Sequence, residues 1–205
     1  MTEDANKSLV PAKPNLPSSR SGGVRVLDRI TSDALAIART RQLAKDVDLT
    51  VTELNVSQKG LTELDLSQYP NLISLNCSLN KLSELDLSHT PRLKELYCWD
   101  NQLSDLDLSR TPRLERLWCE GNQLTKLDLS HTPKLEKLTC GINQLTELDL
   151  SHTPRLDLLF CGENQLTKLD LSHTPKLRGL RCRGNQLTEL DLSNTPLLKK
   201  EDIEL

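Results

Sequence analysis

Six cysteines are the residues of this sequence best suited to nucleophilic attack or to metal binding. They recur at one constant spacing, as Cys77, Cys98, Cys119, Cys140, Cys161 and Cys182. A thiolate can attack a carbonyl group or bind zinc, but zinc ligands usually come in short pairs such as C-x-x-C. The sequence has no such pair, so the even spacing predicts that each cysteine fills the same place in a repeated core, as a small apolar side chain.

The four histidines share another place in the same period: His89, His131, His152 and His173. Arg110 and Asn194 take that place in other copies, which indicates an exposed turn, and no histidine–cysteine nucleophile pair is predicted.

A third repeat position, here called the aspartate column, is Asp in every copy: Asp65, Asp86, Asp107, Asp128, Asp149, Asp170 and Asp191. Backbone amides and nearby hydroxyl groups are expected to satisfy these carboxylates, and calcium bridging is the alternative.

The repeat explains how these residues are positioned. Its unit reads L-x-x-L-x-C-x-x-N-x-L-T-x-L-D-L-S-x-T-P-x and begins at Leu72, Leu93, Leu114, Leu135, Leu156 and Leu177. Alternating apolar residues predict two short extended segments per unit, joined by turns at the Asn and Thr-Pro positions. One unit cannot bury its own leucines, so the units must stack into a solenoid.

These residues resemble the leucine-rich repeat family, whose defining half is L-x-x-L-x-L-x-x-N-x-L, with Cys in place of the third leucine. The 21-residue unit with L-x-x-L-D-L in its second half is similar to the bacterial IRREKO subclass. The resemblance covers about residues 51–198. It implies a right-handed arc with short parallel strands along its concave face, and a binding scaffold of the kind found in bacterial effector or virulence-type proteins.

Three regions follow along the chain. Residues 1–25 are rich in Pro, Ser and Lys and predict a disordered tail, residues 26–50 predict a helical N-terminal cap, and residues 51–205 form the repeats. No apolar stretch is long enough for a membrane span, and the net charge of −3 disfavours nucleic acid and anionic membranes. Six free thiols favour a cytoplasmic location, in the producing cell or in a host cell into which the protein is delivered.

The most informative columns are those that vary, because the scaffold does not dictate them. On the predicted concave face they hold aromatic, acidic and basic residues: Tyr97, Trp99, Trp118, Phe160, Asp100, Glu120, Arg181 and Arg183. Only 2% of the chain is aromatic, so this clustering predicts a surface that binds a protein partner. Tyr97 and Trp118 are predicted to lie on adjacent strands and to stack. No cofactor, metal ion or catalytic residue is predicted, and the oligomeric state stays open.

Two other functions compete with this prediction. The tripeptide Cys98-Trp99-Asp100 matches the C-x-D motif of ubiquitin ligases that follow repeat domains in some bacterial effectors. The chain ends at Leu205 with no room for such a domain, so an enzyme is not predicted. The second alternative is a structural or ion-binding array that uses the ladders of Asp, Ser and Thr.

Overall fold

The computed structural model describes residues 49–199 and 203–204. The predicted tail (1–25) and nearly all of the predicted helix (26–50) therefore lie outside the described residues. Within the described residues there is no helix long and apolar enough to cross a membrane.

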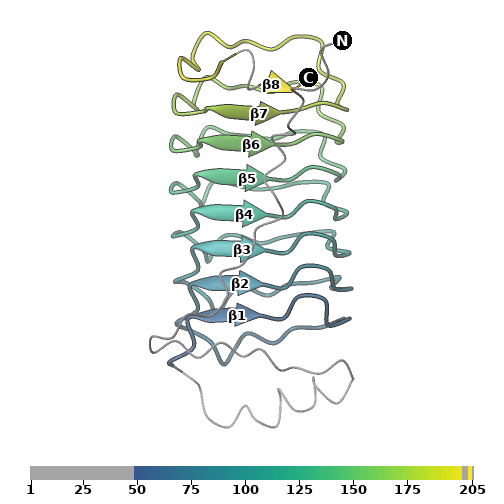
Figure 1. Cartoon of the computed structure of the whole chain (residues 1–205), viewed down its shortest axis with the longest axis vertical. Coiled ribbons are helices and arrows are strands. Elements are labelled where there is room, and N and C mark those ends of the chain that lie inside the picture. Colours follow the sequence, from purple (N-terminus) through teal and green to yellow (C-terminus); the bar gives the residue numbers. More distant parts are fainter. Residues whose placement is uncertain (1–48, 200–202, 205) are drawn as a thin grey trace, which may run out of the picture.

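Each turn of the solenoid contributes one short strand to a parallel sheet that runs in sequence order along one side of the molecule (Figure 1). The strands are β1 (Glu53–Asn55), β2 (Ser74–Asn76), β3 (Glu95–Tyr97), β4 (Arg116–Trp118), β5 (Lys137–Thr139), β6 (Leu158–Phe160), β7 (Gly179–Arg181) and β8 (Ile203–Glu204). Partners from β1 to β7 stand one repeat apart, as in Leu75 with Leu96. Leu180 pairs with Ile203, which lies further along the chain than one repeat would place it, so the last connection is longer than the others.

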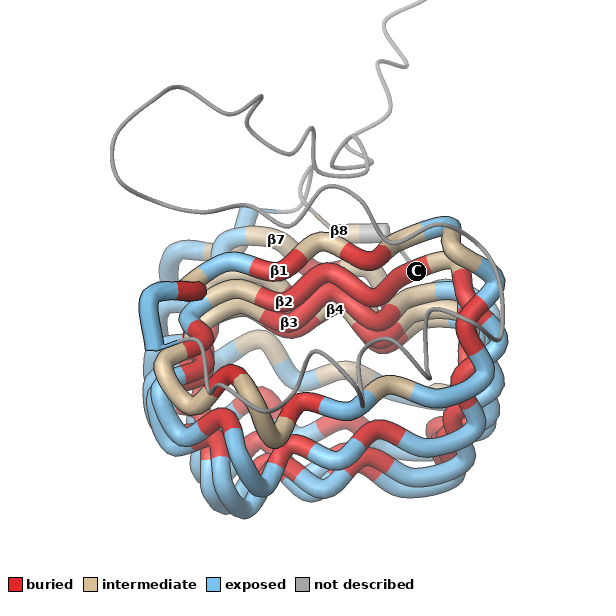
Figure 2. The backbone as a smooth tube through the Cα atoms, turned by 90° about the horizontal axis from the view of Figure 1, so that it is seen from below, coloured by how far each residue is buried: buried red, intermediate tan, exposed pale blue. Residues whose placement is uncertain are grey.

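The second extended segment of each repeat forms no strand in the described turns. Successive turns are joined there by one backbone hydrogen bond each, such as Gln102 N to Leu82 O at 2.9 Å and Gln123 N to Leu103 O at 2.9 Å. Buried leucines still alternate with exposed polar residues along this limb, as the view along the axis shows (Figure 2). The limb is therefore extended and half-buried without a continuous ladder.

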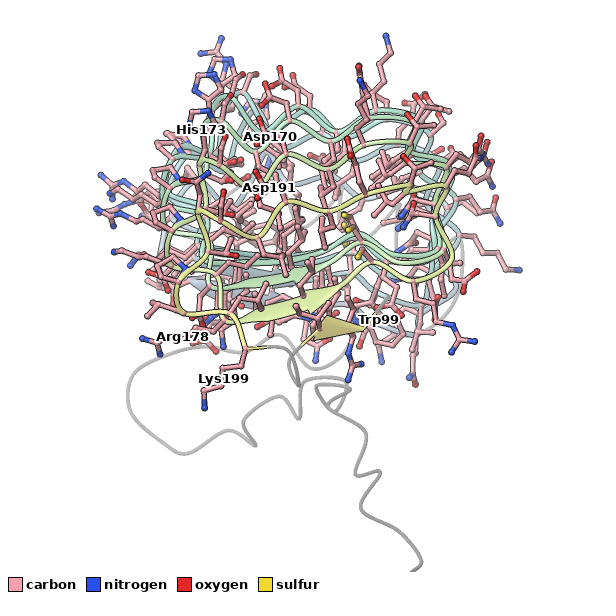
Figure 3. All side chains as sticks on the ribbon, turned by 90° about the horizontal axis from the view of Figure 1, so that it is seen from above. Trp99, Asp170, His173, Arg178, Asp191 and Lys199 are labelled. Carbon is pink, nitrogen blue, oxygen red and sulfur yellow. The ribbon has the colours of Figure 1, made fainter. Side chains whose placement is uncertain are left out.

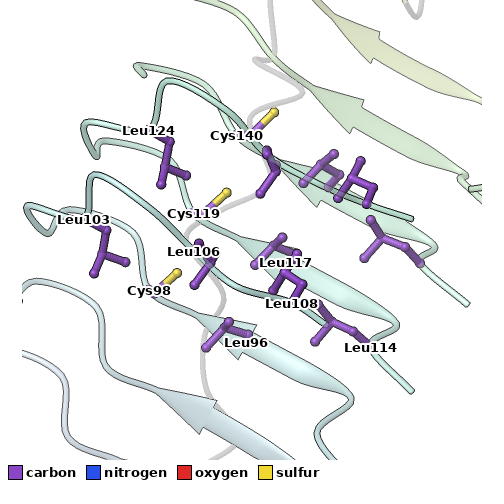
Figure 4. Packing of buried hydrophobic residues seen from close by; sticks show 14 of the residues in the cluster. Leu96, Cys98, Leu103, Leu106, Leu108, Leu114, Leu117, Cys119, Leu124 and Cys140 are labelled. Atoms are coloured by element: carbon purple, nitrogen blue, oxygen red, sulfur yellow. The ribbon is translucent and has the colours of Figure 1, made fainter. Parts of the chain in front are cut away.

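One continuous core fills the solenoid from Val51 to Cys182. Leucines from both limbs meet the cysteines inside it, and Leu96, Leu117 and Cys119 are each 0% exposed (Figure 4). Fully burying a leucine contributes about 1.5–3 kcal/mol, so the stacked leucines are the main source of stability. The predicted role of the cysteines as core residues is confirmed.

Two tight turns in succession carry the chain from the second limb back to the next strand. Around Thr132 its backbone N donates to Leu129 O at 3.0 Å, and Leu135 N donates to Thr132 O at 3.0 Å. The Thr132 hydroxyl also donates to Leu129 O at 2.9 Å, and the side chain is fully buried. The same bonds recur at Thr90, Thr111, Thr153 and Thr174, so this double turn has the same form in each of these repeats.

Candidate binding face

The variable residues of the fifth repeat position lie on the outer side of the sheet. Strand alternation turns Leu96 and Cys98 into the core and leaves Tyr97 between them on the opposite side. The register then places the column Asn76, Tyr97, Trp118, Thr139, Phe160 and Arg181 on neighbouring strands. This face is the one on which the sequence predicted partner binding.

Tyr97 and Trp118 stack on adjacent strands, as predicted. Their ring centroids are 4.7 Å apart and their planes differ by 23°. An aromatic pair of this kind contributes about 0.5–1.5 kcal/mol beyond the area that it buries. The stack therefore holds the indole of Trp118 in a defined orientation on the surface.

Tyr97 is only 5% exposed, so it supports the ring of Trp118 and offers little surface of its own to a partner. Its hydroxyl donates to Glu95 Oε2 at 3.2 Å, and Arg116 forms an ion pair with the same carboxylate. Burial, followed by the charge of Glu95, raises the pKa of Tyr97 to about 12. The more exposed Trp118 is thus the ring of this pair that a partner can reach.

A second aromatic group lies two strands further on. The guanidinium carbon of Arg181 is 4.7 Å from the centroid of the Phe160 ring, which is the geometry of a cation–π contact. Thr139 lies between Trp118 and Phe160 and is only 1% exposed. Its hydroxyl oxygen forms no hydrogen bond with any described residue. The large rings of Trp118 and Phe160, with the small Thr139 between them, therefore make an uneven surface.

The other predicted residues lie just beyond the strands, where the chain turns away from the sheet. Trp99 and Glu120 are half-buried there, whereas Asp100 and Arg183 are exposed. Figure 3 shows Trp99 at one end of the sheet layer and Arg178 at the other. The structure thus places all eight predicted residues on the sheet or at its carboxyl end, although only Tyr97, Trp118, Phe160 and Arg181 belong to strands.

Ile142 is a surface residue that the sequence did not single out. It is 57% exposed, yet its backbone has a left-handed φ of 51°, a conformation that is costly for a β-branched side chain. Gly141 and Gly162 stand beside it, and a Cβ atom on either would come within 3.0 Å of a backbone oxygen of the next turn. Ile142 therefore projects beside a strip of bare backbone. Gly121 and Gly184 occupy the same repeat position as Ile142 and also have a positive φ. These two glycines were the sequence signal that could have predicted the left-handed backbone of Ile142.

The cysteines lack the properties of catalytic thiols. Burial raises the pKa of the Cys98 thiol well above its ordinary value, and that of Cys77 to about 12. Cys98 points into the core, whereas Asp100 is exposed. The two groups of the C-x-D tripeptide therefore lie in different environments.

The aspartate column is used within the fold. Asp128 Oδ1 accepts a hydrogen bond from Ser130 N at 2.9 Å, and equivalent bonds occur at Asp65, Asp86, Asp107, Asp149, Asp170 and Asp191. The predicted partnership with backbone amides is confirmed. All four histidines are exposed. Among the residues that the structure describes, no three His, Cys, Asp or Glu side chains are placed to hold a metal ion.

Comparison with known proteins gives the same architecture. A family model described as leucine-rich repeats (2 copies) matches residues 91–131 and 112–152. No curated protein matches the sequence. Among solved structures, the functional domain of InlJ from Listeria monocytogenes, which includes a cysteine ladder, is 34% identical with a TM-score of 0.62. That match covers 82% of this chain and 40% of InlJ.

Two further neighbours support the fold at lower identity. The leucine-rich-repeat protein LIC12759 of Leptospira interrogans is 22% identical with a TM-score of 0.69, over 85% of this chain and 52% of that one. Internalin C2 of Listeria monocytogenes is 22% identical with a TM-score of 0.59, over 73% of this chain and 79% of that one. The chain thus spans about half or less of the length of InlJ and of LIC12759.

Proposed function

Because this chain is a leucine-rich-repeat protein, we propose that it is a non-catalytic scaffold that binds a protein partner on the outer face of its sheet. The observation that carries the proposal is the gathering of Tyr97, Trp118 and Phe160 in one variable column. The scaffold does not require rings there, since Asn76 and Thr139 occupy the same column. Residues that the fold does not need are available for recognition.

The chemistry of the face suits a protein ligand. Large rings held rigidly lose little side-chain entropy on binding, which is why aromatic and Arg residues dominate protein interfaces. Trp118 is fixed by its stack on Tyr97, and Phe160 by the guanidinium of Arg181. Both anchors are thus ordered before a partner arrives.

Charge along the face would orient the partner. Acidic Asp100 and Glu120 lie near the first aromatic pair, and basic Arg181 and Arg183 lie at the β7 end. Complementary charges on the partner would set its direction along the solenoid and its association rate. An effector-type interaction is the setting that we propose, in keeping with the bacterial origin of the structural neighbours.

The test is to isolate a partner by pull-down from lysates of the producing cell and of a host cell, and then to measure its affinity for variants by calorimetry. We expect Trp99→Ala combined with Trp118→Ala to weaken binding at least 100-fold, since each anchor contributes about 2 kcal/mol. His131→Ala combined with Lys134→Ala, on exposed turns away from the sheet, should leave the affinity unchanged. Equal affinity of the tryptophan variant and the wild type, with both folded by circular dichroism, would contradict the proposal.

A further inference from the structure

Basic side chains form a second surface feature, on the double turns that precede the strands. Two repeat positions are involved, and together we call their ten residues the basic ridge: His89, Arg92, Arg110, Arg113, His131, Lys134, His152, Arg155, His173 and Lys176. All ten are exposed. Five successive turns of the solenoid each contribute two of them, so the ridge runs parallel to the axis.

The fold holds these side chains in a regular array. In each repeat one of the two residues directly precedes a buried threonine and the other follows it after a proline, and backbone hydrogen bonds on both sides of that threonine fix the double turn. Stacked turns repeat at about 4.8 Å, so the four intervals between the five turns of the ridge span roughly 19 Å. The turns are therefore evenly spaced along the ridge, and its Arg and Lys residues form a line of positive charge, with the histidines beside the aspartate column.

The scaffold itself does not require basic residues at these positions. In the turn before the ridge the same places hold Gln68 and Asn71, and in the turn after it they hold Asn194 and Leu197. Both columns thus change from basic to neutral at the same two turns. In the part of the chain that the structure describes, Arg113, Lys134, Arg155 and Lys176 form no ion pair, so stability does not account for their charge.

The surroundings of the ridge limit what it can bind. Glu115, Glu136 and Asp157 follow the ridge residues on the side of the sheet, and the aspartate column precedes them on the other limb. Figure 3 shows His173 at a corner of the solenoid, with Asp170 and Asp191 along the adjoining limb. These acidic flanks would repel a broad anionic object such as a lipid bilayer or a nucleic-acid duplex. A single narrow chain avoids them.

Single-stranded nucleic acid is a poor fit for a different reason. Proteins that bind such strands without sequence preference stack the bases on large aromatic side chains, and neither column of the ridge contains Phe, Tyr or Trp; its only rings are the small imidazoles of the histidines. A line of Arg and Lys side chains without large rings suits a polymer that carries many anionic ester groups and no bases to stack. A linear sulfated polysaccharide has this chemistry, since sulfate groups accept hydrogen bonds from both Lys and Arg.

An open hollow lies at the end of the ridge, with a volume of about 540 Å³. Arg155, Lys176 and Arg178 line it together with Glu136, Asp157 and Leu197. Arg178 approaches Asp157 at 3.6 Å, whereas neither Arg155 nor Lys176 forms an ion pair with an acidic residue in the part of the chain that the structure describes. Leu197 is 45% exposed and offers an apolar contact for a sugar ring. The hollow can therefore seat one sugar ring on Leu197, with its sulfate directed toward Arg155 and Lys176 and away from the carboxylates of Glu136 and Asp157.

We propose that the basic ridge binds a linear sulfated polysaccharide along the solenoid axis, at a site separate from the sheet face. Trp99 lies at the carboxyl end of the sheet layer, whereas the ridge precedes the strands on the opposite side (Figure 3). Both ligands could thus be bound at once. This proposal does not depend on the protein-binding proposal, and either can fail alone.

The experiment titrates the full chain with fluorescently labelled heparin oligosaccharides at several salt concentrations. The ridge variant carries Arg113→Gln, Lys134→Gln and Arg155→Gln. Its control carries Lys81→Gln, Lys126→Gln and Lys168→Gln, three exposed lysines outside the ridge with the same total loss of charge. We expect the ridge variant to bind at least about tenfold more weakly and to lower the slope of log affinity against log salt by about three, one per lost contact. The control should change affinity less than about twofold.

Three comparisons complete the test. Desulfated heparin should bind much more weakly than heparin, and single-stranded DNA and vesicles with phosphatidylserine should bind more weakly as well. No binding of heparin at low salt, equal losses in the two variants, or tighter binding of DNA or vesicles would each overturn the proposal. Thermal melts check that both variants are folded, and neither set of side chains makes an ion pair among the described residues whose loss would lower stability.

Discussion

The asparagine of each repeat joins two turns of the solenoid with one side chain. Asn122 Nδ2 donates to Cys119 O at 3.1 Å in its own turn and to Cys98 O at 3.0 Å in the turn before. Its Oδ1 accepts from Leu103 N at 3.0 Å. These three backbone groups are buried and have no access to water, so the amide satisfies a demand that no apolar side chain could meet.

We therefore predict that Asn122→Ala lowers the free energy of unfolding by about 2 kcal/mol, because the buried Leu103 N loses its acceptor, whereas Cys98 O and Cys119 O keep the bonds from Asn101 and Asn143. Urea unfolding followed by circular dichroism measures the change. Gln123→Ala, at the exposed neighbouring position, should stay within about 0.5 kcal/mol of the wild type. Similar unfolding midpoints for the two variants would show that the asparagine bonds add little.

Individual residues also show which side-chain positions could be predicted from the sequence. The constant spacing placed Cys98 in the core and Tyr97 beside Trp118, because alternation and register together decide both facts. The low exposure of Tyr97 was not predictable, since it depends on the Glu95 carboxylate and Arg116 meeting across neighbouring strands. The exposure of Ile142 was missed because periodicity describes faces of a strand and not the backbone angle at the turn that follows.

At the scale of elements, each turn between the second limb and the next strand begins with the same aspartate. Hydrogen bonds from the Ser151 amide and hydroxyl lower the pKa of Asp149, and Ser172 acts in the same way on Asp170. At Asp128 the Ser130 hydroxyl and then its amide have this effect. The carboxylates are exposed, so each contributes modestly, but six of them have a lowered pKa: Asp86, Asp107, Asp128, Asp149, Asp170 and Asp191.

This ladder predicts a dependence of stability on acid. A carboxyl whose pKa is lower in the folded chain stabilises it above the unfolded value, near 3.8, and loses that contribution as the pH falls through the folded value. We expect the melting temperature to fall from pH 5 to pH 2.5. The fall should be smaller when Asp128, Asp149 and Asp170 are all replaced by Asn, which can accept the same hydrogen bond without titrating. Replacing the exposed acids Glu84, Asp105 and Glu147 by their amides is the control, and an identical effect of both sets would contradict the role of the ladder.

The strands and the second limb differ in how well the sequence predicts them. Both segments alternate apolar and polar residues, and both were expected to be extended. Only the first pairs as a ladder, because its backbone meets the neighbouring turn with several bonds, whereas Gln123 N to Leu103 O joins the second limb once per turn. Hydrophobic alternation reports which side is buried, and it does not report how closely two backbones approach.

At the scale of the whole molecule, each turn contacts mainly its two neighbours, so stability is close to a sum over repeats and their interfaces. Removal of residues 135–155 would join Lys134 to Leu156 and place β4 beside β6 in the same register. We predict a folded protein with a lower urea midpoint and a smaller dependence of unfolding free energy on urea. Removal of residues 135–144, half a turn, should prevent the following turns from stacking. A cooperative, wild-type-like melt of the half-turn deletion would contradict this modular description.

The asparagine bonds and the strand ladder have a mechanical consequence. Both link each turn to the next along the solenoid axis, so a force that pulls the two ends apart acts on a series of near-identical junctions. Tension is equal in every junction of a series, and each junction opens when one whole turn peels from its neighbour. The molecule would therefore lengthen in even steps under a nearly constant force, because each junction that opens releases one repeat of the same length.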